Sequence, residues 1–298
     1  MRVVVTGGSG RLGQFVVREL FTHAHQVSAI DAVKPRECPA PTYLADLNKI
    51  DSLFDHFKNA DAVIHLARQR FPYTESGFNS STQRWEFADV AGDAARFNTN
   101  VAMTNNVLAA AQAAGVKKLV CGSSLAIYGL YFPATDLQPD YLPIDEAHPR
   151  RPQDPYGLSK VVGEKLCDAL SQKSGMQIAS LSFSGIYTEE HRSLLSERKK
   201  HATIRGTGAL WSYIDVRDAA QACRLALEAN FTGHQAFNIC APDTIMDTPT
   251  RELVQRYLPQ VKTVRDDLEG NWCGYATEKA VATLGFRARH LFRNGSLQ

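Results

Sequence analysis

Short apolar runs alternate with longer amphipathic stretches along most of the chain. The first run, Val3–Thr6, precedes a segment from Leu12 to Phe21 in which apolar residues recur at helical spacing. The same pattern predicts further strands at Gln26–Asp31, Thr42–Leu44, Ala62–His65, Lys118–Cys121, Gln177–Phe183 and Ala236–Cys240. Apolar strands that alternate with helices predict an α/β protein with a doubly wound parallel sheet, covered by helices on both faces.

The alternation weakens after residue 183, which predicts two regions. Residues 1–183 would form the main α/β domain, and residues 184–298 would form mainly a smaller substrate-binding region. Within that second region, Ile214–Ala229 has a helical pattern and a strand follows it. We therefore expect residues of about 212–240 to return to the main sheet.

Composition and charge restrict the partners of this protein. Thirty-three Lys and Arg nearly balance 31 Asp and Glu, so no strong field favours nucleic acid or an anionic membrane. No apolar run approaches the ~18 residues of a membrane span, and the early first strand leaves no room for a signal peptide. The six cysteines lack a CxxC pair or metal-ligand spacing, so we expect buried thiols, no metal and a cytoplasmic protein.

The stretch TGGSGRLG (Thr6–Gly13) follows the first predicted strand directly. Its glycines Gly7, Gly10 and Gly13 stand three apart at a strand-to-helix turn. One glycine there permits a tight turn, another lets the backbone approach a pyrophosphate, and the third allows close packing of the helix on the strand. The free N–H groups of the helix start then face the phosphates. An ordinary glycine-rich turn fits the spacing alone, but the strand and helix around it favour a dinucleotide site.

Asp31 closes the second predicted strand, eighteen residues after Gly13. A carboxylate at this place accepts hydrogen bonds from the adenosine ribose hydroxyls and repels a 2′-phosphate. Asp31 therefore favours NAD over NADP. Arg11 and Lys34 are two cations that could hold a 2′-phosphate, so NADP stays an alternative.

Two further motifs carry candidate chemistry. In YGLSK, Tyr156 and Lys160 are four residues apart in a helix expected to begin after Pro155, which places both on one helical face. A phenol titrates near ~10 in water, so it is a weak base at neutral pH unless a cation such as Lys160 stabilises the phenolate. In CGSSLAIYG, which starts at Cys121, Ser124 could hydrogen-bond a substrate hydroxyl or carbonyl. A solvated helix face or a turn would explain each motif singly, whereas their occurrence together favours an active site.

Together these motifs resemble those of the extended short-chain dehydrogenase/reductase superfamily, in its NAD-dependent epimerase/dehydratase group. The resemblance covers nearly the whole chain and includes ADL (Ala45–Leu47), HLA (His65–Ala67), Asn100, SSLAIYG (Ser123–Gly129), PYGLSK (Pro155–Lys160) and YIDVRDAA (Tyr213–Ala220). It implies a Rossmann-type NAD-binding domain, a homodimer, and a catalytic triad of Ser124, Tyr156 and Lys160. The cofactor-binding residues that it implies are Gly7, Gly10, Arg11, Leu12, Gly13, Asp31, Asp46, Leu47, Leu66, Ala67, Asn100, Tyr156, Lys160 and Phe183. Asn100 is also implied to support the active-site helix.

The chain departs from this group after the strand that ends at Phe183. Nucleotide-sugar members often read R-x-F-N-x-Y-G-P there, whereas this chain reads SFSGIYTE, with Ser182 for the arginine and Gly185 for the asparagine. The passage over residues 188–211 is also short for a segment that surrounds a nucleotide diphosphate. A small aldose, polyol or uronate is therefore favoured as substrate. By similarity to uronate dehydrogenases, Arg192 is a candidate partner for a carboxylate, with a solvated loop cation as the alternative. The substrate-binding residues implied are Ser123, Ser124, Gly185 and Arg192.

Residues 68–97 form an insertion that is long for this group. It carries Phe71, Tyr73, Phe78, Trp85 and Phe87 among mixed charges. A long loop with aromatic side chains is often a lid or a binding loop, and an interface with a partner protein is the alternative. We favour a lid, because the insertion follows a predicted strand at the ligand edge of the sheet.

The favoured function is an NAD-dependent oxidoreductase or epimerase that transfers a hydride at a secondary alcohol of a sugar-like substrate. A nucleotide-sugar epimerase or dehydratase is the first alternative. A non-catalytic NAD(P)-binding sensor or scaffold is the second. The presence of Ser124, Tyr156 and Lys160 together favours an enzyme, because a sensor needs the glycines but not the phenol.

Overall fold

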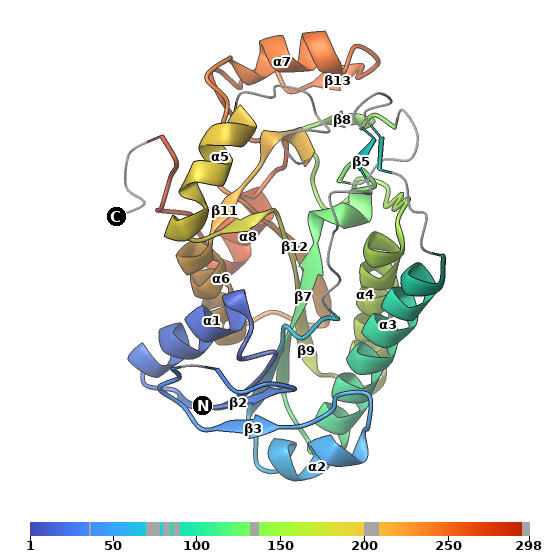
Figure 1. Cartoon of the computed structure of the whole chain (residues 1–298), viewed down its shortest axis with the longest axis vertical. Coiled ribbons are helices and arrows are strands. Elements are labelled where there is room, and N and C mark those ends of the chain that lie inside the picture. The colour runs from blue at the N-terminus through green and yellow to red at the C-terminus, as the bar shows by residue number, and fades with distance from the viewer. Residues whose placement is uncertain are drawn as a thin grey trace.

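A seven-stranded parallel sheet forms the centre of the protein, as the computed structural model shows (Figure 1). The strand order is β12-β9-β7-β4-β1-β2-β3, which confirms the predicted doubly wound α/β fold. The strands of the sheet are β1 (Arg2–Thr6), β2 (Gln26–Asp31), β3 (Thr42–Leu44), β4 (Ala62–His65), β7 (Lys118–Ser124), β9 (Gln177–Phe183) and β12 (His234–Ile239). The structure describes residues 1–35, 37–69, 78–79, 84–85, 90–131, 137–199 and 209–293.

Helices cover both faces of this sheet (Figure 1). Helices α1 (Arg11–Thr22) and α6 (Val216–Glu228) pack against each other on one face. Helices α3 (Val90–Ala113) and α4 (Pro155–Ser174) lie side by side on the other face, and α2 (Asp51–Phe57) packs against α3. Each helical layer covers its own buried apolar cluster, because the short apolar strands present side chains to both faces.

Most of the remaining elements lie beyond the sheet, at the top of Figure 1. The C-terminal residues Trp272 and Cys273 share a buried cluster with Tyr128, so the C-terminal region packs onto the loop after β7. These further elements are β5 (Phe78–Asn79), β6 (Arg84–Trp85), η2 (Leu125–Tyr128), β8 (Tyr141–Leu142), β10 (Ile186–Tyr187), η3 (Glu189–His191), α5 (Arg192–Lys199), η4 (Ala209–Trp211), β11 (Ile214–Asp215), α7 (Thr250–Tyr257), β13 (Thr263–Val264) and α8 (Glu278–Leu284). The division into regions 1–183 and 184–298 stays a prediction.

Strand β7 is longer than its apolar run predicts. The sequence pattern ends the strand at Cys121, but the strand continues through Ser124. Its last three residues, 122–124, pair in parallel register with residues 181–183 of β9. Main-chain pairing therefore extends the strand over residues that are small or polar. As a result, Ser124 lies at the carboxyl edge of the sheet.

The strand order reverses between β1 and β4. From β1 the chain runs outward to β2 and β3, and from β4 it runs the other way to β7, β9 and β12. Thr6 and His65 pair at the carboxyl ends of these two strands, and Thr6 Oγ1 lies 2.7 Å from His65 Nδ1. Open α/β sheets bind ligands at such a reversal, so the fold places a ligand site beyond these two residues.

The predicted insertion at residues 68–97 is described only in part. The structure describes residues 68–69, 78–79, 84–85 and 90–97, and the last of these ranges belongs to α3. Phe71, Tyr73 and Phe87 lie outside the described residues, and so does most of the proposed lid. Among the residues that are described, no helix is long and apolar enough to cross a bilayer, and no group of three His, Cys, Asp or Glu could hold a metal ion.

Candidate active site

Three glycines of the first loop, Gly7, Gly10 and Gly13, have different structural roles. Gly7 has φ +77°, and a Cβ there would lie 2.5 Å from the Ala67 nitrogen. A Cβ on Gly13 would overlap the Gly7 carbonyl oxygen. A Cβ on Gly10 would have only that same oxygen within 4 Å, at 3.1 Å, among the described residues. Gly7 and Gly13 are therefore required by the packing of the chain on itself, whereas Gly10 leaves space in front of the loop.

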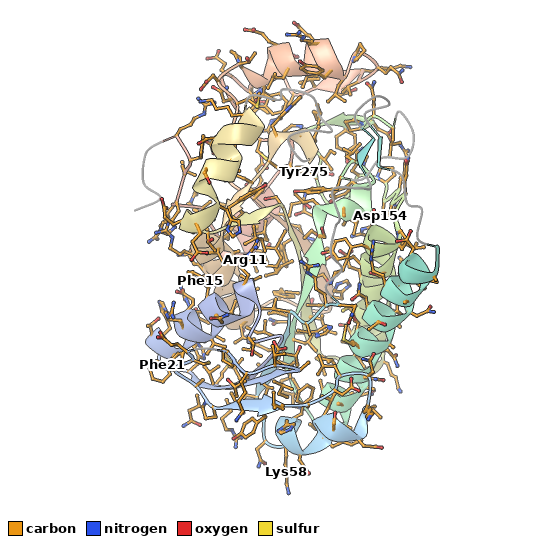
Figure 2. All side chains as sticks on the ribbon, in the orientation of Figure 1. Arg11, Phe15, Phe21, Lys58, Asp154 and Tyr275 are labelled. Atoms are coloured by element: carbon orange, nitrogen blue, oxygen red, sulfur yellow. The ribbon has the colours of Figure 1, made fainter. Side chains whose placement is uncertain are left out.

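Helix α1 begins at this space. Gly10 is its N-cap residue and offers no side chain to the first free N–H groups. Arg11 is exposed and Leu12 is half-buried in the first turn. Arg11 at the start of α1 and Asp154 at the start of α4 lie on opposite sides of the sheet in Figure 2. An uncapped helix start with a neighbouring cation fits the pyrophosphate of a dinucleotide.

Asp31 lies beside the same loop. Its carboxylate accepts hydrogen bonds from the N–H groups of Ser9 (2.9 Å) and Ala32 (2.7 Å). These bonds fix a half-buried negative charge next to the glycine loop. The position fits recognition of an adenosine ribose without a 2′-phosphate. Lys34, three residues after Asp31, is exposed.

The residues that the resemblance implies at the adenine, Asp46 and Leu47, and beside the pyrophosphate and ribose, Leu66 and Ala67, differ in exposure. Asp46 is exposed, and hydrogen bonds from Asn48 lower the pKa of its carboxyl, so this group is anionic. Leu47 is buried in the core, which leaves Asp46 as the side chain that faces outward here. Leu66 and Ala67 are half-buried after β4, and Ala67 touches Gly7. These last two residues therefore border the dinucleotide loop.

Tyr156 and Lys160 lie one turn apart at the start of α4. Asp154 caps this helix by accepting a hydrogen bond from the Gly157 N–H at 2.8 Å. The Lys160 ammonium lies 5.7 Å from the centre of the Tyr156 ring and donates a 2.8 Å hydrogen bond to the Gly122 carbonyl oxygen. Within the described part of the chain, the Tyr156 hydroxyl has no hydrogen-bond partner. The phenol is therefore free to meet a ligand.

The adjacent serines Ser123 and Ser124 point in different directions, as alternation along a strand requires. Ser124 Oγ accepts a hydrogen bond from the Ala126 N–H at 3.2 Å, which leaves its proton available for a substrate oxygen. Ser123 Oγ instead donates to the buried carboxylate of Glu164 at 2.6 Å. The Ser123 hydroxyl is therefore engaged with Glu164, and its contact with a substrate stays a prediction.

Asn100 joins the two halves of the site. Its side-chain oxygen accepts a hydrogen bond from the Gln69 N–H at 2.9 Å, just beyond β4. Its amide group donates to Ser159 Oγ at 3.5 Å, on α4. The segment after β4 and the helix that carries Tyr156 are thus held in one frame.

The residues after β9 differ from the sequence-based expectation. Phe183 is buried in the apolar cluster between the sheet and α1, and its implied contact with the cofactor stays a prediction. Gly185 donates its N–H to the Tyr131 hydroxyl at 2.7 Å, and a Cβ there would meet the Tyr187 ring at 3.0 Å. An aromatic ring therefore occupies the space that an asparagine side chain would take. Arg192 is the first residue of α5, and its side chain lies outside what the structure describes.

Two features of the site were missed from the sequence. The Arg68 guanidinium lies 5.8 Å from the centre of the Tyr156 ring. Its position directly after the HLA motif (His65–Ala67) was the sequence signal that could have placed Arg68 at the site. Glu164 is buried, one turn beyond Lys160, and its carboxylate pairs with Arg150 at 2.8 Å.

Burial shifts the titration of two groups near the site. It raises the pKa of Asp154 to about 6, although the N–H groups of Gly157 and Tyr156 oppose the shift. It lowers the pKa of His65 to about 3, and the Lys160 cation adds to this effect. His65 is therefore neutral and lies within hydrogen-bonding distance of Thr6 and Thr104. It is a structural residue at the end of β4.

The doubly wound sheet, the glycine loop and the Ser124, Tyr156 and Lys160 arrangement define a dinucleotide-binding protein of the short-chain dehydrogenase/reductase type. The sequence matches the NAD dependent epimerase/dehydratase family over residues 3–240. The chain therefore belongs to that family, and the resemblance predicted from its motifs is confirmed.

Relatives in this family include both a dehydrogenase and epimerases. The L-arabinose 1-dehydrogenase (NAD(P)(+)) of Haloferax volcanii is 29% identical over 235 residues, which are 77% of this chain and 83% of that protein. A putative UDP-glucose 4-epimerase of Methanocaldococcus jannaschii is 32% identical over 196 residues, which are 63% of this chain and 56% of that protein. These relatives share the family of this chain but differ in the reaction that their names give.

Solved structures share the fold. A short-chain dehydrogenase/reductase superfamily protein from Agrobacterium tumefaciens with bound NAD has a TM-score of 0.72 at 23% identity, covering 100% of this chain and 96% of its own. The UDP-glucose 4-epimerase from Bifidobacterium longum, in complex with NAD⁺ and UDP, has a TM-score of 0.71 at 21% identity, with the same coverage. The described part of the chain thus shares the architecture of these proteins.

Proposed function

We propose that this chain is an NAD-dependent oxidoreductase that transfers a hydride from a secondary alcohol of a small sugar-like substrate to bound NAD. The observation that carries the proposal is the placement of Tyr156. Its unbonded phenol stands beside the Lys160 ammonium, at the carboxyl edge of β7 where Ser124 ends the strand. The dinucleotide loop occupies the same edge of the sheet.

The residues around this edge fit NAD. The space at Gly10 and the free N–H groups of α1 would hold the pyrophosphate, with Arg11 beside it. The Asp31 carboxylate would accept hydrogen bonds from the ribose hydroxyls, and Asp46 would lie at the adenine. Lys160 would bind the second ribose through the ammonium protons that Gly122 does not use.

The chemistry of the chain is proton transfer and charge stabilisation. In its phenolate form, Tyr156 accepts the proton of the substrate hydroxyl as the C–H bond of that carbon breaks. Lys160 stabilises the phenolate before the transfer, and Ser124 donates a hydrogen bond to the substrate oxygen. The oxygen then becomes that of a ketone or lactone. Return of the hydride to the opposite face would give an epimer instead.

A small substrate is supported by what surrounds Gly185. The Tyr187 ring fills the space beside it, and Ser182 directs its hydroxyl toward Glu164 at 3.4 Å. The Gly185 N–H and the Ser182 hydroxyl are thus not directed to a pyrophosphate, and burial of that group without partners would cost several kcal/mol. The L-arabinose 1-dehydrogenase relative supports an aldose, a polyol or a uronate. Arg192, at the start of α5, is the proposed partner of a carboxylate.

A nucleotide-sugar epimerase is the second candidate, favoured by the putative UDP-glucose 4-epimerase among the relatives. The two reactions are distinguished by incubation with NAD and a panel of aldoses, polyols, uronates and nucleotide sugars. We expect net accumulation of NADH with a small sugar. Formation of an isomer without NADH would indicate an epimerase. Micromolar binding of nucleoside diphosphates to the NAD-loaded protein, measured by calorimetry, would contradict the small-substrate proposal.

We further propose that the enzyme is a cytoplasmic homodimer. All six cysteines, each within the described residues, are free thiols, which fits a reducing compartment. The paired helices α3 and α4 form an outer layer on which the apolar side chain of Leu158 is exposed. Sedimentation velocity should give a dimer for the wild type and a shift toward monomer for Leu158→Asp. A wild-type monomer at micromolar concentration would contradict the dimer.

A further inference from the structure

Arg68 is held at the rim of the proposed active site by its neighbours on both sides. The Leu66 N–H donates to the Thr6 carbonyl oxygen at 2.9 Å, and Ala67 packs against Gly7. On the other side, the Gln69 N–H donates to Asn100, which in turn reaches α4. The backbone at Arg68 is therefore fixed to both the dinucleotide loop and the helix of Tyr156.

The Arg68 side chain meets Tyr156 itself. Its guanidinium carbon lies 5.8 Å from the ring centre, and the Lys160 ammonium lies 5.7 Å from the same centre. Two cations thus lie beside the ring of the proposed catalytic phenol. Contact with an aromatic ring restrains a guanidinium while its N–H groups stay free to bond elsewhere.

Two other arginines near α4 are already paired. Arg150 binds the buried Glu164, and Arg96 binds Asp93 at 3.2 Å. Within the part of the chain that the structure describes, Arg68 has no carboxylate partner and is exposed. A single unpaired guanidinium beside the reacting group matches one negative charge on a ligand, and its planar fork matches the two oxygens of a carboxylate.

We propose that Arg68 determines specificity by binding a carboxylate that the substrate carries near the alcohol to be oxidised, so that sugar acids are the preferred substrates. This inference rests on the proposed function. The carboxylate lies against Arg68 while the alcohol oxygen meets Tyr156 and Ser124. Arg68 is thus a candidate for the carboxylate contact in addition to Arg192.

The test compares three matched compounds, D-glucose, D-glucuronate and a phosphate ester of glucose, with wild type, Arg68→Met and Arg68→Lys. Lys58→Met is the control, because Lys58 is an exposed cation that precedes β4, whereas Arg68 follows this strand, and Lys58 lies at the bottom of Figure 2, away from the labelled Asp154. We expect Arg68→Met to lower kcat/KM for the sugar acid at least about tenfold more than for glucose, with the difference mainly in KM. Arg68→Lys should recover part of the loss, and NAD affinity should stay constant.

Equal losses on the acid and on glucose would overturn the proposal, because Arg68 would then act on Tyr156 and not on a carboxylate. A loss confined to the phosphate ester would overturn it as well. Calorimetry measures the binding of D-glucuronate to the NAD-loaded wild type and to NAD-loaded Arg68→Met, and so tests the carboxylate contact without turnover. If wild type oxidises none of the three compounds, the proposed function fails. The proposal for Arg68 then holds only if Arg68→Met binds D-glucuronate more weakly than wild type in the calorimetry.

Discussion

The Lys160 ammonium donates a 2.8 Å hydrogen bond to the carbonyl oxygen of Gly122. This bond ties α4 to the carboxyl end of β7, two residues before Ser124. The same ammonium lies 5.7 Å from the Tyr156 ring centre. One side chain thus supports the frame of the site and supplies its positive charge.

Lys160→Ala should therefore damage both chemistry and cofactor binding. We expect turnover to fall about 100-fold, the scale of lost acid–base catalysis, because the phenolate loses its neighbouring cation. The Kd for NAD should rise, because the ammonium is proposed to bind the second ribose. Fluorescence titration with NAD measures the second effect. An effect on turnover alone would contradict the double role.

Gly10 and Gly13 should respond differently to the same substitution. Gly13→Ala places a Cβ against the Gly7 carbonyl oxygen and should cost about 3 kcal/mol of stability or prevent folding. Gly10→Ala meets only one atom at 3.1 Å and should cost about 1 kcal/mol while weakening NAD at least tenfold. Urea unfolding and NAD titration give both quantities. Full NAD affinity in folded Gly10→Ala would remove this residue from the cofactor site.

Asp31 should control the choice of cofactor. Asp31→Ala removes the carboxylate that the Ser9 N–H holds beside the loop. NAD binding should weaken and rejection of NADP should be relieved, so the ratio of the two affinities should shift toward NADP. Direct titration of both cofactors measures this ratio. A wild-type preference for NADP would contradict the assignment and direct attention to Arg11 and Lys34.

Asp154 should make stability depend on pH in a defined window. Its folded-state pKa is raised by burial from 3.8 to about 6, so the folded state favours the protonated form. The contribution of Asp154 to the free energy of unfolding is therefore full below pH 3.8 and is lost as the pH rises through about 6. Asp154→Asn keeps a capping oxygen and removes this titration. From below this window to above it, the stability of the variant should rise by about 3 kcal/mol relative to that of wild type.

Urea unfolding of both proteins across this window measures the difference. Taking the difference cancels the opposite contribution of His65, whose lowered pKa makes stability rise with pH. A constant difference between variant and wild type would show that Asp154 does not titrate there.

The sequence predicted the parts of the fold that depend on local apolar runs. Strands such as Gln26–Asp31 and Gln177–Phe183 have the predicted bounds, because their side chains are buried on both faces. The predicted end of β7 was wrong, because Gly122 and the two serines after it are in the strand through pairing with β9 and not through apolar character. Pairing between distant strands leaves no local signal.

The site was predictable where a motif fixes spacing and not where contacts are distant in the sequence. Tyr156 and Lys160 share a helix face, so their proximity followed from a spacing of four. Ser123 meets Glu164 from 41 residues away, and no local pattern indicates this pair. Phe183 illustrates a different ambiguity, since an apolar residue at a strand end can face either the core or a ligand.

Tyr156→Phe tests the central claim most directly, because it removes one oxygen atom and keeps the ring that Arg68 and Lys160 contact. NADH formation with the best substrate of the panel should fall at least about 100-fold, as expected when a general base is lost. The Kd for NAD should match that of the wild type in the same preparation. Unchanged turnover with intact NAD binding would exclude Tyr156 as the base and contradict the proposed mechanism.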